Sequence, residues 1–427
     1  MKKKIKNVLI LVFLTVFCLL VFVSCNRQGA QNILKYSEDD LGVMGKLVKL
    51  MHDWIGNYGW TVVVFTVFLK IFMLPLDFWQ RYASRKSTLK MQQMQPIIEG
   101  IDKRYGANTQ RANEEKQKLY KKQGFSMLSS CLPMIVSMVI FFIMFAGLRN
   151  YSTYSSITNF QKMYDVYYSE YSRLISDDTE LQDAYKIAHD AAEEELNKKT
   201  DDKQEIKVKS QMKGIVAARK INATKCDGYR EEALKKVKEE YERNRESWLW
   251  IQNVWQPDTW ATVMQPYDGG SFDGGAFSSS VNLTDLFTEE EAKDLYNDLR
   301  NAVLDGSGYG GNGSWNGLMI LPVMSIGLSF LSMFISQRLE RKNRKGEVVE
   351  QNKQQKTTNR MMMIIMPLMM AWFGFIYTGA FAIYMVVNYT LSILSTVLMR
   401  YPVEKVVMKR LNKDENKKKS NKATYMR

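Results

Sequence analysis

Apolar runs of membrane length alternate with strongly polar segments along this chain. A transmembrane helix needs about 20 consecutive apolar residues. The pattern therefore predicts an all-α polytopic membrane protein with five core transmembrane helices, at residues 57–76, 126–148, 316–336, 361–378 and 381–399. Only Thr378, Gly379 and Ala380 separate the apolar cores of the last two runs, which predicts a tight antiparallel helical hairpin.

Two of the polar segments carry helical patterns of their own. Residues 26–56 contain an amphipathic stretch, Asp40–Trp54, whose apolar residues recur at helical spacing. We expect this helix to lie in the membrane interface. Residues 77–125 are polar and helical in pattern, with a break at residues 106–108, and they predict a helical hairpin.

A long polar insert occupies residues 149–315. Its first part, 151–247, is dense in charge and rich in Glu, Lys, Ala and Tyr, which predicts helices outside the membrane. Aromatic residues suited to a membrane interface follow at 248–260. Residues 265–317 are rich in Gly, Ser and Asp and predict a flexible loop.

The distribution of charge predicts the orientation of the spans. Lys and Arg outnumber Asp and Glu by 11 to 5 in residues 77–127, by 8 to 3 in the loop 337–360, and by 10 to 3 in residues 399–427, which hold the basic tail 400–427. By the positive-inside rule, these segments are cytoplasmic. Residues 151–315 have 20 basic against 30 acidic side chains, so the insert and residues 26–56 are expected to be extracytoplasmic.

Composition argues against covalent catalysis. The chain has 427 residues, a formal charge of +14, four cysteines and two histidines. Three of the cysteines lie in apolar runs, so no disulfide framework is indicated. Two histidines do not support a metal cluster or a histidine-based triad, and no phosphate-binding glycine loop is present in the sequence. We expect no enzyme activity, no metal and no cofactor.

The N-terminal residues 1–25 have the pattern of an export signal. Four lysines precede the apolar run 8–23, and the sequence VFVSC ends at Cys25. This ending resembles a bacterial lipoprotein cleavage site, in which the cysteine is lipidated and becomes the first mature residue. Phe22 departs from the leucine-like residue usual at its position. The alternative is that residues 1–25 remain as an uncleaved first transmembrane helix.

Lys70 is the only charge within the five apolar runs. A charge at mid-membrane depth costs about 2.5–3.5 kcal/mol on insertion scales, so intramembrane charges usually have a function. Thr66 lies one helical turn earlier and shares its face. Two interpretations remain open: Lys70 extends to a lipid headgroup, or it lines a water-filled polar face within the membrane.

Several sequence strings, taken in order, resemble the YidC family of membrane protein insertases. They are GNYGWTVVVFTVFLKIFMLPL in the first span, MQQMQPII and QKLYKKQGF in the polar hairpin, SSCLPMIVSM in the second span, LWIQNVWQPD after the insert, and RMMMIIMPLMMAWF with TGAFAIYMVVNY in the last two spans. The resemblance covers about residues 41–150, 248–265 and 316–400, and it implies a bacterial cytoplasmic (inner) membrane protein.

In that family, a positive residue lines a hydrophilic groove that opens to the cytoplasm and to lipid. The resemblance places this charge on Lys70, with Thr66 beside it, where the family usually has arginine. Lysine keeps the charge but lacks the planar guanidinium fork. Ser137, Tyr384 and Asn388 occupy matching inward-facing positions in other spans. The alternative role for these three side chains is a packing hydrogen bond between helices.

The resemblance also implies partners. The clients are nascent membrane proteins, which the chain would insert and help to fold in the lipid bilayer, alone or with the Sec translocon. The basic tail has two open roles, contact with the ribosome or positive-inside anchoring. No DNA binding is expected. The alternative function is a small-solute transporter or channel with Lys70 as its substrate site; inverted repeats would favour it, and none is visible in the apolar runs.

Two departures from the family pattern stand out. Residues 151–247 have no recognisable counterpart, so we expect that deleting them spares basic insertion activity. The large external domain that many Gram-negative members carry before the first core span is replaced by the short segment 26–56.

If Cys25 is lipidated, the mature protein begins there and carries acyl groups. Intact-mass measurement of purified protein should give a chain without residues 1–24 and with added acyl mass. Replacing Cys25 with alanine (Cys25→Ala) should block processing and leave the precursor mass. A wild-type chain that still begins at Met1 would show that residues 1–25 are a retained helix.

Overall fold

The computed structural model describes residues 31–32, 37–105, 109–122, 127–260, 264, 281–282, 288–304, 315–340, 364, 368, 372 and 374–424. Helices account for nearly all of these, which confirms the all-α prediction. They are α2 (Val43–Ile55), α3 (Tyr58–Tyr105), α4 (Thr109–Lys122), α5 (Met127–Ser176), α6 (Gln182–Asn197), α7 (Lys203–Ile221), α8 (Ala223–Asn244), α9 (Glu289–Leu304), α10 (Ile320–Glu340) and α12 (Gly379–Thr424).

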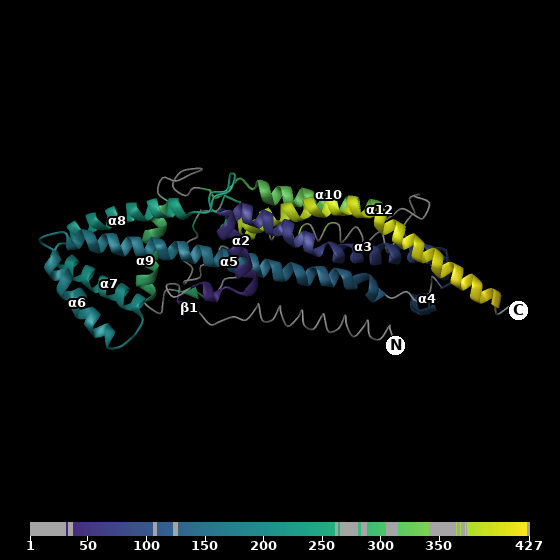
Figure 1. The fold of residues 1–427 in the computed structure, drawn as a ribbon, viewed down its shortest axis with the longest axis horizontal. Coiled ribbons are helices and arrows are strands. Elements are labelled where there is room, and N and C mark those ends of the chain that lie inside the picture. Colours follow the sequence, from purple (N-terminus) through teal and green to yellow (C-terminus); the bar gives the residue numbers. More distant parts are fainter. Residues whose placement is uncertain are drawn as a thin grey trace.

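The molecule is elongated (Figure 1), with α6–α9 gathered at one end and α4 and the C-terminal part of α12 at the other. Helices α3, α5, α10 and α12 run lengthwise between them. A 3-10 turn (Glu38–Asp40) precedes α2, and one short parallel pair joins β1 (Gln31–Asn32) to β2 (Val281–Asn282). Cys25 lies outside the described residues.

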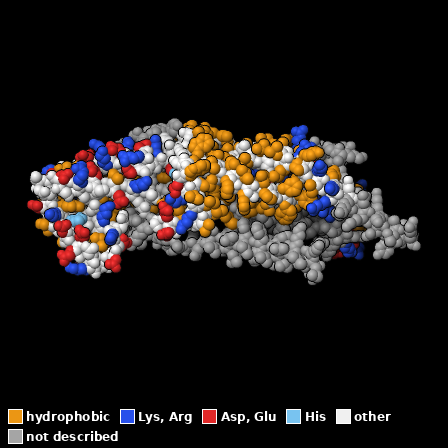
Figure 2. All heavy atoms as spheres, viewed as in Figure 1, with side chains coloured by type: hydrophobic (Ala, Val, Ile, Leu, Met, Phe, Trp, Pro, Cys, Tyr) orange, Lys and Arg blue, Asp and Glu red, His pale blue; other side chains and the backbone are white. Residues whose placement is uncertain are grey.

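Within the described part of the chain, α3, α10 and α12 are long and apolar enough to cross a membrane. They contain three of the five predicted runs. Residues 127–148 of a fourth run belong to α5, although most of their side chains are outside the described residues. The run 361–378 is mostly outside the described residues. Large apolar side chains cover the outer faces of these spans, as the broad orange area in Figure 2 shows.

The helix of the first apolar run does not end with that run near residue 76. Helix α3 runs without interruption to Tyr105, through Pro75 and Pro96. A proline inside a helix removes one backbone donor, but α3 has packing partners beyond Pro75. Leu89 is buried against Val403 and Val407 of α12, and Phe78 and Tyr82 of α3 pack against the same cluster. Helix α4 follows, and Lys116 Nζ lies 2.5 Å from Asp102 Oδ1 of α3.

The basic tail is likewise continuous with the last span. Helix α12 begins at Gly379 and continues past Pro402 to Thr424. The sequence predicted a span ending at 399 and then a tail. The two join because Val403, Val407 and Leu411 recur at helical spacing and form a buried cluster with α3.

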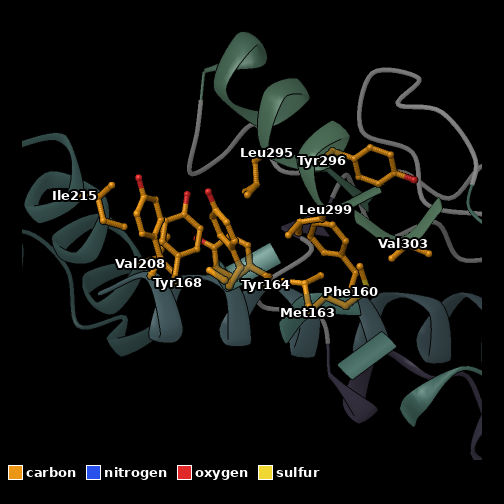
Figure 3. Close-up of a cluster of buried hydrophobic side chains, with 14 of the residues drawn as sticks. Phe160, Met163, Tyr164, Tyr168, Val208, Ile215, Leu295, Tyr296, Leu299 and Val303 are labelled. Carbon is orange, nitrogen blue, oxygen red and sulfur yellow. The ribbon is translucent and has the colours of Figure 1, made fainter. Parts of the chain in front are cut away.

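Helix α5 carries the chain from the membrane into the insert without a break. It is 50 residues long, so its second half, together with α6–α9, forms the insert. The insert has its own apolar core of α5, α7, α8 and α9 side chains, rich in tyrosine. Figure 3 shows Phe160 of α5 beside Leu299 of α9, while Tyr168 of α5 lies toward Val208 of α7.

Helix α9 corrects the prediction that residues 265–317 form a flexible loop. Glu289–Leu304 is helical and packs into the insert core. Its start is a capping box: Thr288 Oγ1 accepts from Glu291 N at 3.3 Å, and Thr288 N donates to Glu291 Oε2 at 2.9 Å. The glycine-rich residues on both sides dominated the composition of this window and hid the helix.

One stretch, residues 246–258, holds the first turns of three candidate spans; we call it the junction segment. The buried Asp258 carboxylate accepts from the backbone N–H groups of Leu318 at 2.9 Å, Met319 at 3.2 Å and Leu321 at 2.8 Å, where α10 begins. It also accepts from Trp250 Nε1 at 3.2 Å. These bonds satisfy donors that a helix start otherwise leaves unpaired.

The junction segment caps α3 and α12 in the same way. Glu246 Oε2 accepts from Tyr58 N at 3.1 Å at the start of α3. Gln256 O accepts from Gly379 N at 2.7 Å at the start of α12. The N-termini of these spans are thereby tied together at the end of the molecule that adjoins the insert.

Removing α6 and α7 together should leave the rest of the fold intact. The residues on either side of the pair already touch: Asn222 Nδ2 donates to Glu180 Oε1 at 3.3 Å, and Lys225 Nζ lies 2.5 Å from Asp178 Oδ2. We expect a chain with residues 182–221 replaced by two glycines to reach near-normal membrane levels, measured by immunoblot. Its unfolding temperature in detergent should fall by roughly 5–10 °C, because buried apolar contacts are lost.

Deletion of all of 151–247 is the contrasting variant. It cuts α5 in two and removes Glu246, which caps α3. From the structure we therefore expect this chain not to accumulate, in contrast to the expectation from the sequence that the deletion spares insertion activity. Equal membrane levels of the two deletions would contradict the structural role assigned to α5 and Glu246.

Candidate functional site

Four charged residues of α3 form a stripe along one face of the helix. Lys70, Asp77, Arg81 and Arg85 follow one another at spacings of seven, four and four residues, which places them on the same side of an α-helix. We call them the charged stripe. Each of the three basic members contacts α12, so the stripe lies along the seam between these two helices.

Lys70 contacts two partners at the end of this seam that is nearer the N-terminus of α3. Its Nζ lies 2.9 Å from Asp77 Oδ2, and it donates to Ser392 Oγ of α12 at 3.2 Å. The side chains of Lys70 and Asp77 are only 17% and 16% exposed. The ammonium is therefore turned inward toward α12, in a polar site that the protein itself provides.

The arginines continue the seam toward the C-terminal end of α3. Arg81 Nη2 lies 3.4 Å from both Ser392 O and Ser395 Oγ. Arg85 donates from Nε at 2.7 Å and from Nη2 at 2.9 Å to the two carboxylate oxygens of Glu404. Such a bidentate pair is the strongest geometry available to arginine.

The sequence analysis missed Asp77, Arg81, Arg85 and Glu404 as members of this site. Their spacing on α3 was a usable signal, but the boundary drawn near residue 76 separated Lys70 from the others. Glu404 lies in the predicted tail, and nothing in the sequence alone shows that this tail packs against α3.

Thr66 and Tyr384 lie in buried surroundings. Thr66 is 2% exposed, and its Oγ1 donates to Val62 O of its own helix at 2.6 Å. Tyr384 is 5% exposed, with its ring 6.2 Å from that of Phe381.

Asn388 has a different position. It is half-buried on α12, one turn before Ser392, the partner of Lys70. Ser137 lies within α5, and its side chain is outside the described residues. Asn388 thus shares a face of α12 with Ser392, which contacts Lys70.

Apolar side chains flank the stripe on the outer surface. On α3, Phe68 is 50% exposed, Ile71 61% and Phe72 74%. Exposed large side chains of α10 and α12 extend this surface, among them Val323, Leu331, Phe334, Leu394, Val397 and Leu398. A charged seam therefore lies beside a wide surface suited to lipid tails.

A second polar cluster lies at the junction segment. His52 Nε2 and Glu246 Oε1 are 2.7 Å apart, and the His52 ring stacks on Tyr58. Burial lowers the pKa of His52 and raises the pKa of Glu246. Because Glu246 also caps α3, we interpret this cluster as structural: it fixes α2 to the start of the first span.

A possible metal-ligand group occurs once among the described residues. His189, Asp190 and Glu193 of α6 have ligand atoms within 4.8 Å of one another. All three lie on one surface turn, and the His189 ring stacks on Tyr185 with its Nδ1 3.1 Å from Asp190. This arrangement is an ordinary surface ion-pair network and is remote from the charged stripe.

Comparison with known proteins gives matches over most of these elements. A model of the family described as 60Kd inner membrane protein matches residues 50–187 and 232–406, more than half of the chain. Proteins named Membrane protein insertase YidC match shorter parts. The one from Caldanaerobacter subterraneus is 37% identical over 113 residues, which is 26% of this chain and 53% of that protein.

Two further proteins of that name come from Campylobacter jejuni and Treponema pallidum. They are 35% and 36% identical over 107 and 105 residues, or 25% of this chain in each case. The matched region spans about half the length of the Caldanaerobacter protein, and 20% and 16% of the lengths of these two.

The family match corrects the prediction that residues 151–247 have no counterpart. It extends to 187 and resumes at 232, leaving residues 188–231 unmatched. The second half of α5 thus belongs to the shared frame. The unmatched part is most of α6, all of α7 and the start of α8, which lie at the far end of the molecule (Figure 1).

Removing the partner of Arg85 should destabilise the protein. Arg85 is 9% exposed, and Glu404→Gln replaces its charged partner with a neutral one. We expect a loss of about 1–3 kcal/mol, less than for a fully buried pair because Glu404 is partly exposed. Chemical or thermal unfolding in detergent measures this loss.

The control is Glu99→Gln, which removes an exposed carboxylate from the same helix. It should change stability by less than about 0.5 kcal/mol. Equal effects of the two substitutions would mean that the Arg85–Glu404 pair contributes nothing to holding α12 on α3.

Proposed function

Because the chain belongs to the 60Kd inner membrane protein family, whose matching relatives are named membrane protein insertases, we propose that it inserts nascent membrane proteins into a bacterial cytoplasmic membrane. It also helps them to fold, alone or with the Sec translocon. The observation that supports this proposal best is the position of Lys70, a cation in the first span that faces polar side chains of α12 beside a wide apolar surface.

The seam suits the physical task of insertion. A client must move a polar segment through an apolar layer, and every unpaired polar group there costs free energy. The hydroxyl groups of Ser392 and Ser395 and the charges of the stripe offer that segment hydrogen-bond partners. The apolar faces of α3 and α10 then let an apolar client helix pass sideways into lipid.

Lys70 is the residue we propose to attract acidic client segments. Among the other candidates, Asn388 is the best placed to line the same groove, because it lies one turn from Ser392 and is only half-buried. The burial of Thr66 and Tyr384 supports a packing role for these two. Ser137 stays a candidate groove residue from its place in the sequence.

The proposed orientation places the junction segment and the insert outside the cytoplasm. The common position of the α3, α10 and α12 N-termini supports it, since these spans then all cross in the same direction. On the opposite side, Lys405 and Lys409 of α12 are solvent-exposed or partly so. We propose that this basic helix contacts ribosomal RNA through phosphate charge.

The test of this function is the charge at position 70. Lys70→Arg keeps a cation of similar length and should retain insertion. Lys70→Ala and Lys70→Glu should lower insertion of clients with acidic exported tails by roughly 3- to 10-fold, since about 1 kcal/mol of attraction is lost. Clients with neutral tails should be affected less.

Complementation of an insertase-depleted strain measures the effect, with protease protection of the client tail as the readout. The membrane level of each variant is checked by immunoblot, and Lys86→Ala, outside the apolar run, is the charge-loss control. Full activity of Lys70→Glu on acidic-tailed clients would falsify the electrostatic role of Lys70.

A further inference from the structure

The groove cation is already paired within its own helix. Lys70 Nζ lies 2.9 Å from Asp77 Oδ2, and both side chains are about five-sixths buried. Asp77 is the first residue of the polar segment that follows the apolar run. A carboxylate therefore occupies the position next to Lys70 that the proposed function assigns to an acidic client segment.

From this contact we infer that Asp77 is an internal competitor for Lys70 and sets how strongly the groove selects acidic clients. The inference rests on the proposed function, in which Lys70 receives a carboxylate of the client. The ligand class is a client Asp or Glu side chain, and its binding is an exchange: the client carboxylate takes the ammonium, and the Asp77 carboxylate gives it up.

The neighbouring charges make such an exchange physically reasonable. A lone ammonium at this depth is costly, and a nearby carboxylate spares the resting state an uncompensated buried charge. Arg81 lies one turn beyond Asp77 on the same face, so a second cation is within one helical turn of the displaced carboxylate. Throughout the exchange, Lys70 and Asp77 each have an opposite charge nearby.

The exchange predicts that neutralising Asp77 strengthens the selection of acidic clients. Asp77→Asn removes the competitor but keeps the size and most hydrogen-bonding capacity of the side chain. The Lys70 charge should then act on clients at full strength. If Asp77 instead served only to hold α3 against α12, its loss would weaken insertion of all clients alike.

The experiment compares matched clients whose exported tails differ only by Asp/Glu against Asn/Gln. The readout is the ratio of acidic-tail to neutral-tail insertion in the same membranes, so differences in insertase level cancel. Asp77→Asn should raise this ratio about threefold or more, and Asp77→Glu should leave it near the wild-type value. Asp77→Ser is the second neutral variant, should Asp77→Asn fail to accumulate.

Two controls separate this inference from the function on which it rests. Lys70→Gln should lower the ratio. The double variant Lys70→Gln with Asp77→Asn should match Lys70→Gln alone, because without the Lys70 ammonium there is no cation for Asp77 and the client to compete for. Glu99→Gln removes an exposed carboxylate from the same helix but outside the seam, and it should leave the ratio unchanged.

An unchanged or lowered ratio in Asp77→Asn, together with a lowered ratio in Lys70→Gln, overturns the role of Asp77 and leaves the proposed function standing. A ratio that neither substitution moves overturns the electrostatic part of the proposed function itself. A rise in the double variant equal to that of Asp77→Asn alone would also overturn the inference, since the effect would not pass through Lys70.

Discussion

The fold depends on satisfying the backbone donors at the starts of its spans. In an apolar environment each unpaired N–H group costs several kcal/mol, and the first turn of a helix has four such donors. The junction segment meets this demand for three spans at once, through the carboxylates of Glu246 and Asp258 and the carbonyl of Gln256. A Cβ atom on Gly317 would collide with Asp258, so the approach at α10 requires glycine.

Fixing the spans at one end leaves the other end to side-chain chemistry. There the seam between α3 and α12 is held by polar side chains, with Lys70 on Ser392 and Arg85 on Glu404. The two ends differ in kind: backbone donors meet buried acceptors at the junction segment, and side chains pair along the seam. The proposed function, in which the seam admits a polar client segment, requires contacts of the second kind, because side-chain pairs can be exchanged without unfolding a helix.

Three of the five apolar runs fall in described helices that are long and apolar enough to cross a membrane, and the single charge within the runs lies in the candidate site. The sequence could not show where that charge would point, because the partner of Lys70 lies beyond a boundary that Pro75 and the change in composition both suggested. Glu404 and Ser392 reach the site only through the packing of α12 on α3, which no local pattern encodes. The capping box at Thr288 was visible in the sequence, but a glycine-rich window obscured it.

Helix α5 gives the insert a mechanical connection to the membrane part. At 1.5 Å per residue, its 50 residues form a rod about 75 Å long. A loop between the two parts would let each turn independently, whereas an unbroken helix joins them stiffly. The direction in which the insert projects is therefore set by the direction of α5 in the other half of the molecule.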